Sequence, residues 1–140
     1  MPNGKIEFFL DSNILIYAAA GRLDEPSKYR VAFGLVGDGR FGISAQTLAE
    51  FCHVVRRKSL LPDSELDEWL SYLDSFPGTA VDNALVQAGL ALARRYDIAY
   101  YDAALLAAAD RLGAPTFYSE DLNHGQYYGS VRVLNPFLES

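Results

Sequence analysis

Short apolar segments alternate with longer helical patterns along this chain, and this alternation limits the possible fold more than any other feature. The apolar segments are residues 6–10 (IEFFL), 40–44 (RFGIS), 79–81, 116–119 (TFYS) and 131–135 (VRVLN). Strands that are apolar along their length and separated by helices favour a parallel sheet with helices on both faces. The sequence therefore predicts an α/β sandwich, and 140 residues are consistent with one domain covering residues 1–140.

Six helical segments are expected between and after these strands. The first follows residue 11, with Ser12 or Asn13 as its cap, and the second runs from Ser27 to Gly37 or Gly39. The third follows Ser44 as its cap and reaches about Lys58. The remaining segments cover residues 63–76, 83–97 and 101–113.

The overall charge and the single cysteine exclude some classes of function. A net charge of −6 argues against binding nucleic acid through general basicity, although it leaves room for a local basic groove. Cys52 has no partner for an internal disulfide, and its helical, apolar setting favours burial over a nucleophilic role. No segment has the roughly 20 apolar residues of a membrane span, and the start lacks a signal-peptide pattern. We expect a cytoplasmic protein.

Four acidic residues occupy positions where the predicted fold would bring them together. Asp11 directly follows the first strand, Asp121 follows the strand at 116–119, Asp102 begins a helix, and Glu50 lies within one. Each alone has a structural explanation, namely a helix cap, a loop acid, a first-turn acid and a solvated helix face. Ligands of parallel sheets bind beyond the carboxyl ends of the strands, so these side chains are expected to converge there.

Converging carboxylates would repel one another unless a cation lay among them. Oxygen ligands without His or Cys are typical of Mg²⁺ and Mn²⁺ sites. Such ions activate water and stabilise charge on a phosphate, so the pattern suggests phosphodiester hydrolysis.

Four segments, taken in order, give the chain a resemblance to the PIN-domain ribonucleases, and most closely to the VapC-type toxins of VapBC toxin–antitoxin pairs. These segments are FFLDSNILIYA, ISAQTLAEF, YYDAALLAAADRLGA, and TFYSEDLNHGQ followed by VRVLNPF. The resemblance implies a five-stranded parallel sheet between helices. It also implies that Asp11, Glu50, Asp102 and Asp121 are the catalytic, metal-binding acids, because the family's spacing selects Asp121 over the adjacent Glu120. Ser12, Asn13 and Ser119 would support them.

The same resemblance implies a function and partners. The expected activity is Mg²⁺- or Mn²⁺-dependent hydrolysis of RNA by water, without a covalent enzyme intermediate, and with tRNA or rRNA as target. A small VapB-type antitoxin would cover the acidic pocket, often through an arginine, and the toxin would form a homodimer. No membrane partner is implied.

Several basic residues are candidates for contacts with RNA: Arg22, Arg56, Arg57 and Lys58. The run Arg56 to Lys58 follows the helix of Glu50, where it could guide the RNA backbone towards the acids. The alternative is an ordinary solvated helix end, stabilised by the helix dipole.

Three other functions are compatible with parts of the pattern. A phosphatase of the haloacid-dehalogenase type also opens with a strand and an aspartate, but it needs a second aspartate where this chain has Asn13. A non-catalytic PIN module would be expected to have lost acids that are all present here. A housekeeping RNA-processing PIN nuclease would differ from a toxin in lacking an adjacent small reading frame for a DNA-binding antitoxin.

Overall fold

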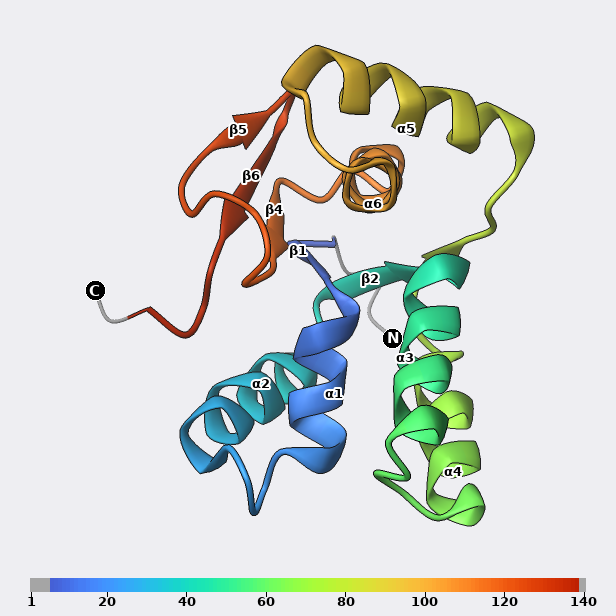
Figure 1. Ribbon diagram of the computed structural model, residues 1–140, viewed down its shortest axis with the longest axis vertical. Helices are drawn as coiled ribbons and strands as arrows, with labels where there is room; N and C mark the ends of the chain where they lie inside the picture. The colour runs from blue at the N-terminus through green and yellow to red at the C-terminus, as the bar shows by residue number, and fades with distance from the viewer. Residues whose placement is uncertain (1–5, 139–140) are drawn as a thin grey trace.

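A mixed sheet forms the centre of the computed structural model, which describes residues 6–138 (Figure 1). Its strands are β1 (Phe8–Leu10), β2 (Phe41–Ser44), β3 (Gly78–Thr79), β4 (Thr116–Tyr118), β5 (Tyr127–Tyr128) and β6 (Val131–Leu134). They lie in the order β3-β2-β1-β4-β6-β5, and every pair is parallel except β5 with β6. The five parallel strands confirm the predicted sheet, and the short β5 adds a sixth strand that was not predicted.

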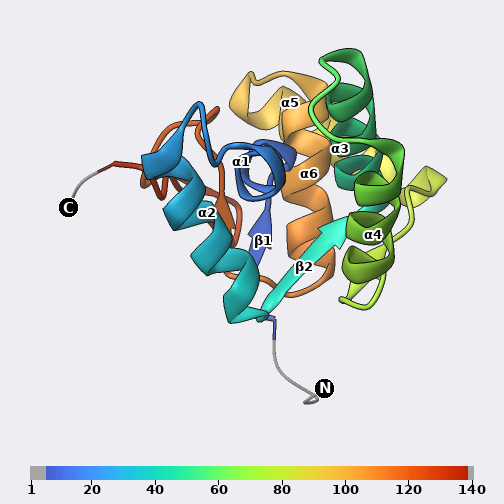
Figure 2. The same ribbon diagram turned by 90° about the horizontal axis from the view of Figure 1, so that it is seen from below.

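Six helices surround this sheet, as the sequence predicted (Figure 1 and Figure 2). They are α1 (Ser12–Ala20), α2 (Pro26–Asp38), α3 (Ala45–Arg57), α4 (Asp63–Leu73), α5 (Asn83–Tyr96) and α6 (Tyr100–Arg111). Gly39 ends α2 in the left-handed conformation, with a φ of 84° that favours glycine. Ser44 caps α3, as predicted, by accepting a hydrogen bond from the Thr47 amide. Within residues 6–138, no helix has the length and apolarity needed to cross a membrane.

The sheet separates two hydrophobic cores, and β1 contributes to both. Phe8 and Leu10 pack into the core shared with α1, α2, α3 and α4, whereas Phe9 faces the core beneath α5 and α6. Figure 1 shows these two sets of helices on opposite sides of the strands. Successive residues of a strand point to opposite faces, so an all-apolar β1 requires cover on both sides. The predicted three-layer sandwich is thus confirmed.

Helix α6 is held close to α5 by small side chains. All residues from Ala103 to Ala109 are buried. Gly89 of α5 lies so close to α6 that a Cβ atom there would be 3.0 Å from the Cα atom of Ala104. A side chain there would push the two helices apart by a few tenths of an ångström, so glycine favours this close crossing. The close packing fixes α6 relative to the sheet and thereby fixes the position of Asp102 in its first turn.

Candidate metal site at the carboxyl edge of the sheet

Asp11 lies at the junction of β1 and α1, where it both caps the helix and points towards other acids. Its Oδ1 atom accepts a hydrogen bond of 2.7 Å from the Ser12 amide. The backbone of Asp11 is extended (φ −73°, ψ 158°), while Ser12 and Asn13 are already helical. The cap is thus Asp11, and the expectation of Ser12 or Asn13 as cap was wrong. This frees the Ser12 and Asn13 side chains for other contacts.

Ser119 connects Asp11 to the loop that follows β4. Its buried hydroxyl donates to Asp11 Oδ2 at 2.7 Å and accepts from the Asp121 amide at 3.0 Å. The strand register explains this contact, because Leu10 pairs with Tyr118 and the next residues of both strands therefore lie side by side. One hydroxyl group thus positions the side chain of one acid and the backbone of another.

Glu50 on α3 is tied to both α1 and α6. Its Oε1 accepts from the Ser12 hydroxyl at 3.1 Å, and its Oε2 accepts from Gln46 Nε2 at 3.1 Å. The same Gln46 nitrogen donates to the carbonyl oxygen of Tyr101, next to Asp102, at 3.0 Å. The sequence interpretation did not select Gln46, although its i, i+4 spacing to Glu50 was a signal for such a pair.

The adjacent acids Glu120 and Asp121 point to different partners. Asp121 Oδ2 accepts from Asn13 Nδ2 at 3.0 Å. Glu120 instead accepts from the Tyr17 hydroxyl at 2.6 Å and pairs with Lys28 Nζ at 2.9 Å. The structure therefore places the carboxylate of Asp121 among the other acids, while the charge of Glu120 is balanced by α2.

Asp11, Glu50, Asp102 and Asp121 form what we call the acidic site, and their charges are not balanced by basic side chains. Burial raises the pKa of Asp11 to about 7, and the neighbouring charges of Asp121 and Glu50 add to this effect. Burial also raises the pKa of Asp102, with contributions from Asp121 and Glu50, and the pKa of Asp121, with a contribution from Glu120. None of the ion pairs within residues 6–138 includes a member of the acidic site.

The chemistry of the acidic site fits a hard divalent cation. Its donors are all oxygen atoms, its negative charge is in excess, and the buried Asn13 Oδ1 has no hydrogen-bond partner among the described residues. Within residues 6–138, no three Asp, Glu, His or Cys side chains already lie close enough together to hold one ion. Binding by three of these acids therefore requires at least one side chain to rotate. The donor set matches that of Mg²⁺ or Mn²⁺.

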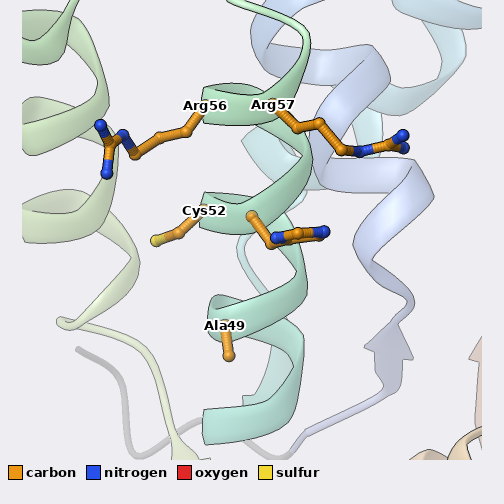
Figure 3. Close-up of a pocket in the computed structure, with 5 residues that line it drawn as sticks. Ala49, Cys52, Arg56 and Arg57 are labelled. Atoms are coloured by element: carbon orange, nitrogen blue, oxygen red, sulfur yellow. The ribbon is translucent and has the colours of Figure 1, made fainter.

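The residues predicted to contact RNA lie at the ends of two different helices. Arg56 and Arg57 line an open pocket of about 450 Å³ on α3, together with Ala49, Cys52 and His53. Figure 3 shows the two arginine side chains pointing to opposite sides of the helix. Lys58 follows as the exposed C-cap of α3.

Arg22 is also exposed, but it follows α1 at the end opposite Asp11, about 13 Å along the helix axis for its nine residues. Arg56 and Arg57 thus lie on the same helix as Glu50, whereas Arg22 lies beyond the end of α1 that is far from Asp11.

Solved structures with this fold include several from toxin–antitoxin systems. A toxin–antitoxin complex from Klebsiella pneumoniae has 19% sequence identity and a TM-score of 0.70, covering 93% of this chain and 98% of that one. VapC20 of Mycobacterium tuberculosis, a sarcin–ricin-loop-cleaving toxin, has 16% identity and a TM-score of 0.67, with coverages of 82% and 90%. VapBC2 from Rickettsia felis, bound to a promoter DNA fragment, has 18% identity and a TM-score of 0.62, with coverages of 90% and 96%.

These identities are low, so the structural similarity establishes the fold alone. No curated protein sequence matches the chain. The pattern of the PIN domain family, however, matches residues 8–129, which include β1 with Asp11, the helices with Glu50 and Asp102, and the loop with Asp121. The chain therefore belongs to the PIN domain family.

Proposed function

We propose that this protein is a Mg²⁺- or Mn²⁺-dependent endoribonuclease and the toxin of a toxin–antitoxin pair. The observation that carries the proposal is the acidic site itself, whose four carboxylates come from four separate segments and lack basic partners within the described residues. Keeping carboxylates that repel one another close together, with Asp11 buried, is costly, and a bound cation would offset that cost. RNA is the proposed substrate because the similar VapC20 is described as cleaving the sarcin–ricin loop.

The residues of the acidic site have distinct proposed roles. A bound Mg²⁺ or Mn²⁺ would activate a water molecule and stabilise negative charge on the phosphate. Asp11, Asp102 and Asp121 would hold the cation, and Glu50 would complete the ligands or orient the attacking water. Ser119 would keep Asp11 and Asp121 in place through its two hydrogen bonds.

Two smaller side chains would position Glu50 and Asp121. The Ser12 hydroxyl orients Glu50, and the Asn13 amide orients Asp121. Such supporting hydrogen bonds to metal ligands commonly affect metal affinity and activity.

A protein partner is part of the proposal. Two of the similar structures contain an antitoxin with the toxin, which supports a VapB-type partner for this chain. The proposal also includes a homodimer, because the family resemblance implies one. Exposed apolar side chains on α2 and α5, including Phe33 and Val86, offer surface for such contacts. An antitoxin arginine reaching the acidic site would find unbalanced carboxylates there.

Cleavage of an RNA pool by the purified protein tests this function. We expect tRNA or rRNA to be cut with Mg²⁺ or Mn²⁺ and to remain intact with a chelator. Asp102→Asn keeps the side-chain shape but removes the charge, so it is expected to abolish cutting. The matched control is Asp110→Asn, because this exposed residue lies near the other end of α6. Equal cutting by wild type and Asp102→Asn, or RNA binding without any cutting, would refute a nuclease site here.

A further inference from the structure

A pocket of about 670 Å³ lies directly beside the acidic site, and we call it the flanking pocket. Ser12 and Glu50 line it, so it shares a wall with the acidic site. Its remaining lining includes Ala49 and Val54 of α3 and Tyr101 of α6. The flanking pocket thus presents apolar and aromatic surface immediately next to the carboxylates.

Tyr101 is a preformed aromatic surface in this pocket. Its side chain is 67% exposed, although its backbone carbonyl is fixed by the hydrogen bond from Gln46. Its ring packs edge-to-face against Tyr100, with the ring centroids 5.1 Å apart. An exposed aromatic ring with a fixed backbone is suited to stacking on an unpaired base.

The flanking pocket continues into the basic pocket of Arg56 and Arg57. Both pockets are lined by Ala49 and His53. Glu50 and Arg57 lie two turns apart on one face of α3, about 10 Å along its axis. Figure 3 shows Arg57 extending towards the side of the helix on which the blue ribbon of α1 lies. Neither arginine forms an ion pair within residues 6–138.

We propose that the flanking pocket binds one unpaired RNA base next to the phosphate held at the acidic site. Tyr101 stacks on this base, and Arg56 and Arg57, which point to opposite sides of α3, contact different phosphates of the neighbouring backbone. The arrangement along α3 supports this assignment. The apolar and aromatic flanking pocket lies between the acidic site and the pocket of Arg56 and Arg57, and both of these are suited to a phosphate. This inference rests on the proposed nuclease function and adds a site for one base beside the cut, which paired bases inside a duplex cannot reach.

Binding of a labelled, random-sequence single-stranded RNA of about ten nucleotides tests the stacking role. The Asp102→Asn background prevents cleavage during the measurement of the dissociation constant by fluorescence anisotropy. Tyr101→Ala is expected to weaken binding about fivefold or more, as loss of one stacked base does elsewhere. Tyr101→Phe should bind like the parent protein. Tyr127→Ala is the matched control, because Tyr127 is 60% exposed but lies on β5 at the far edge of the sheet.

The salt dependence of binding tests the phosphate contact. The double variant Arg56→Gln/Arg57→Gln should lower the slope of log affinity against log salt by roughly one for each lost contact. Arg94→Gln/Arg95→Gln is the matched control, since these residues form the same arginine pair in the last turn of α5. This control should leave the slope unchanged, and a duplex RNA of the same length should not respond to Tyr101→Ala.

Cleavage assays with protein that retains Asp102 distinguish failure of the base pocket from failure of the nuclease proposal. If the protein cuts RNA with metal, but Tyr101→Ala binds and cuts like wild type, the base pocket is refuted and the nuclease proposal stands. If wild type neither binds nor cuts single-stranded RNA, the nuclease proposal fails and the base pocket fails with it.

Discussion

Two helices of this protein begin with a capping aspartate, and the two caps lie in opposite electrostatic surroundings. Asp11 caps α1 in a buried position, among carboxylates, and its pKa is raised to about 7. Asp82 caps α5 on the surface and pairs with Arg111 at 2.9 Å. Its hydrogen bonds to Arg111 and to the Leu85 amide lower its pKa. The same capping motif therefore carries a balanced charge at Asp82 and an unbalanced charge at Asp11.

The difference shows where a sequence motif is ambiguous. A cap explains why an aspartate precedes a helix, but only the surroundings show whether the charge is balanced. At Asp82 the charge is balanced, so the residue serves stability. At Asp11 it is not, and the surplus charge is what marks the acidic site as a candidate for function.

Replacing each capping aspartate by asparagine is expected to give the largest contrast. Asparagine is an equally good cap, so neither variant should lose its helix. Asp11→Asn should lower the RNA cleavage rate on the order of a thousandfold, because a metal ligand contributes several kcal/mol to catalysis. Asp82→Asn should cleave at the wild-type rate. Single-turnover kinetics on one RNA would measure both, and an active Asp11→Asn would end the proposed role of this residue.

The pH dependence of the free energy of unfolding tests whether the Asp11 carboxyl group differs from an ordinary capping aspartate. Because the pKa of Asp11 rises from 3.8 to about 7 on folding, folded protein keeps a proton that the unfolded chain releases above pH 4. In the presence of a chelator, this contribution should lower the free energy of unfolding as the pH rises from 4 to 7. The decrease should be on the order of a few kcal/mol.

Asp11→Asn should remove this decrease, so the difference in the free energy of unfolding between variant and wild type should grow with pH. Urea unfolding at pH 5 and pH 8 would measure it. A difference that stays constant with pH would show that the carboxyl group of Asp11 ionises normally in the folded protein.

Ser119→Ala is expected to have an intermediate effect. The variant removes the hydroxyl that donates to Asp11 and accepts from the Asp121 amide, but it leaves all four acids in place. Loss of such a supporting group typically reduces metal affinity or activity 10- to 100-fold, so we expect a decrease of about this size. Calorimetric titration with Mn²⁺ would measure it. Ser130→Ala, which removes an exposed hydroxyl bonded to Asp110, is the control and should titrate like wild type.

The smallest effect is expected for a change of Asp82, the cap of α5. Asp82→Ala removes both the cap of α5 and its surface ion pair, which should lower the free energy of unfolding slightly. RNA cleavage should not change. Thermal unfolding of Asp82→Ala beside Asp82→Asn would separate the cap from the charge. A large loss of activity in Asp82→Ala would show that the two caps are not functionally distinct.

The sequence predicted most of the fold because its signals were local. Apolar strands, capping residues and helical periodicity identified all six helices and the five parallel strands. The short β5 was missed because a strand of two residues is too short to show alternation, although the turn at Gly129 between Tyr128 and Val131 is a hairpin signal. The cap of α1 was misplaced by one or two residues because Asp11, Ser12 and Asn13 are all good caps.

The acidic site was only partly accessible from sequence. Positions after strands suggested that Asp11 and Asp121 would converge, whereas Glu50 on an amphipathic helix was indistinguishable from a solvated residue without the family resemblance. The contacts of Gln46 with Glu50 and the Tyr101 carbonyl depend on how α3 and α6 pack, which no local pattern determines.

The pairing of Glu120 with Lys28 has a consequence for how this site could change over evolutionary time. The turn after β4 carries two neighbouring carboxylates, of which one faces the other acids and one is held away by Tyr17 and Lys28. A lineage that lost Asp121 would still carry an acid one residue away, but releasing it would require loss of the contacts from both Tyr17 and Lys28. The orientation of the second carboxylate in this turn is therefore determined by two side chains from other segments, and it can change only when both of them change.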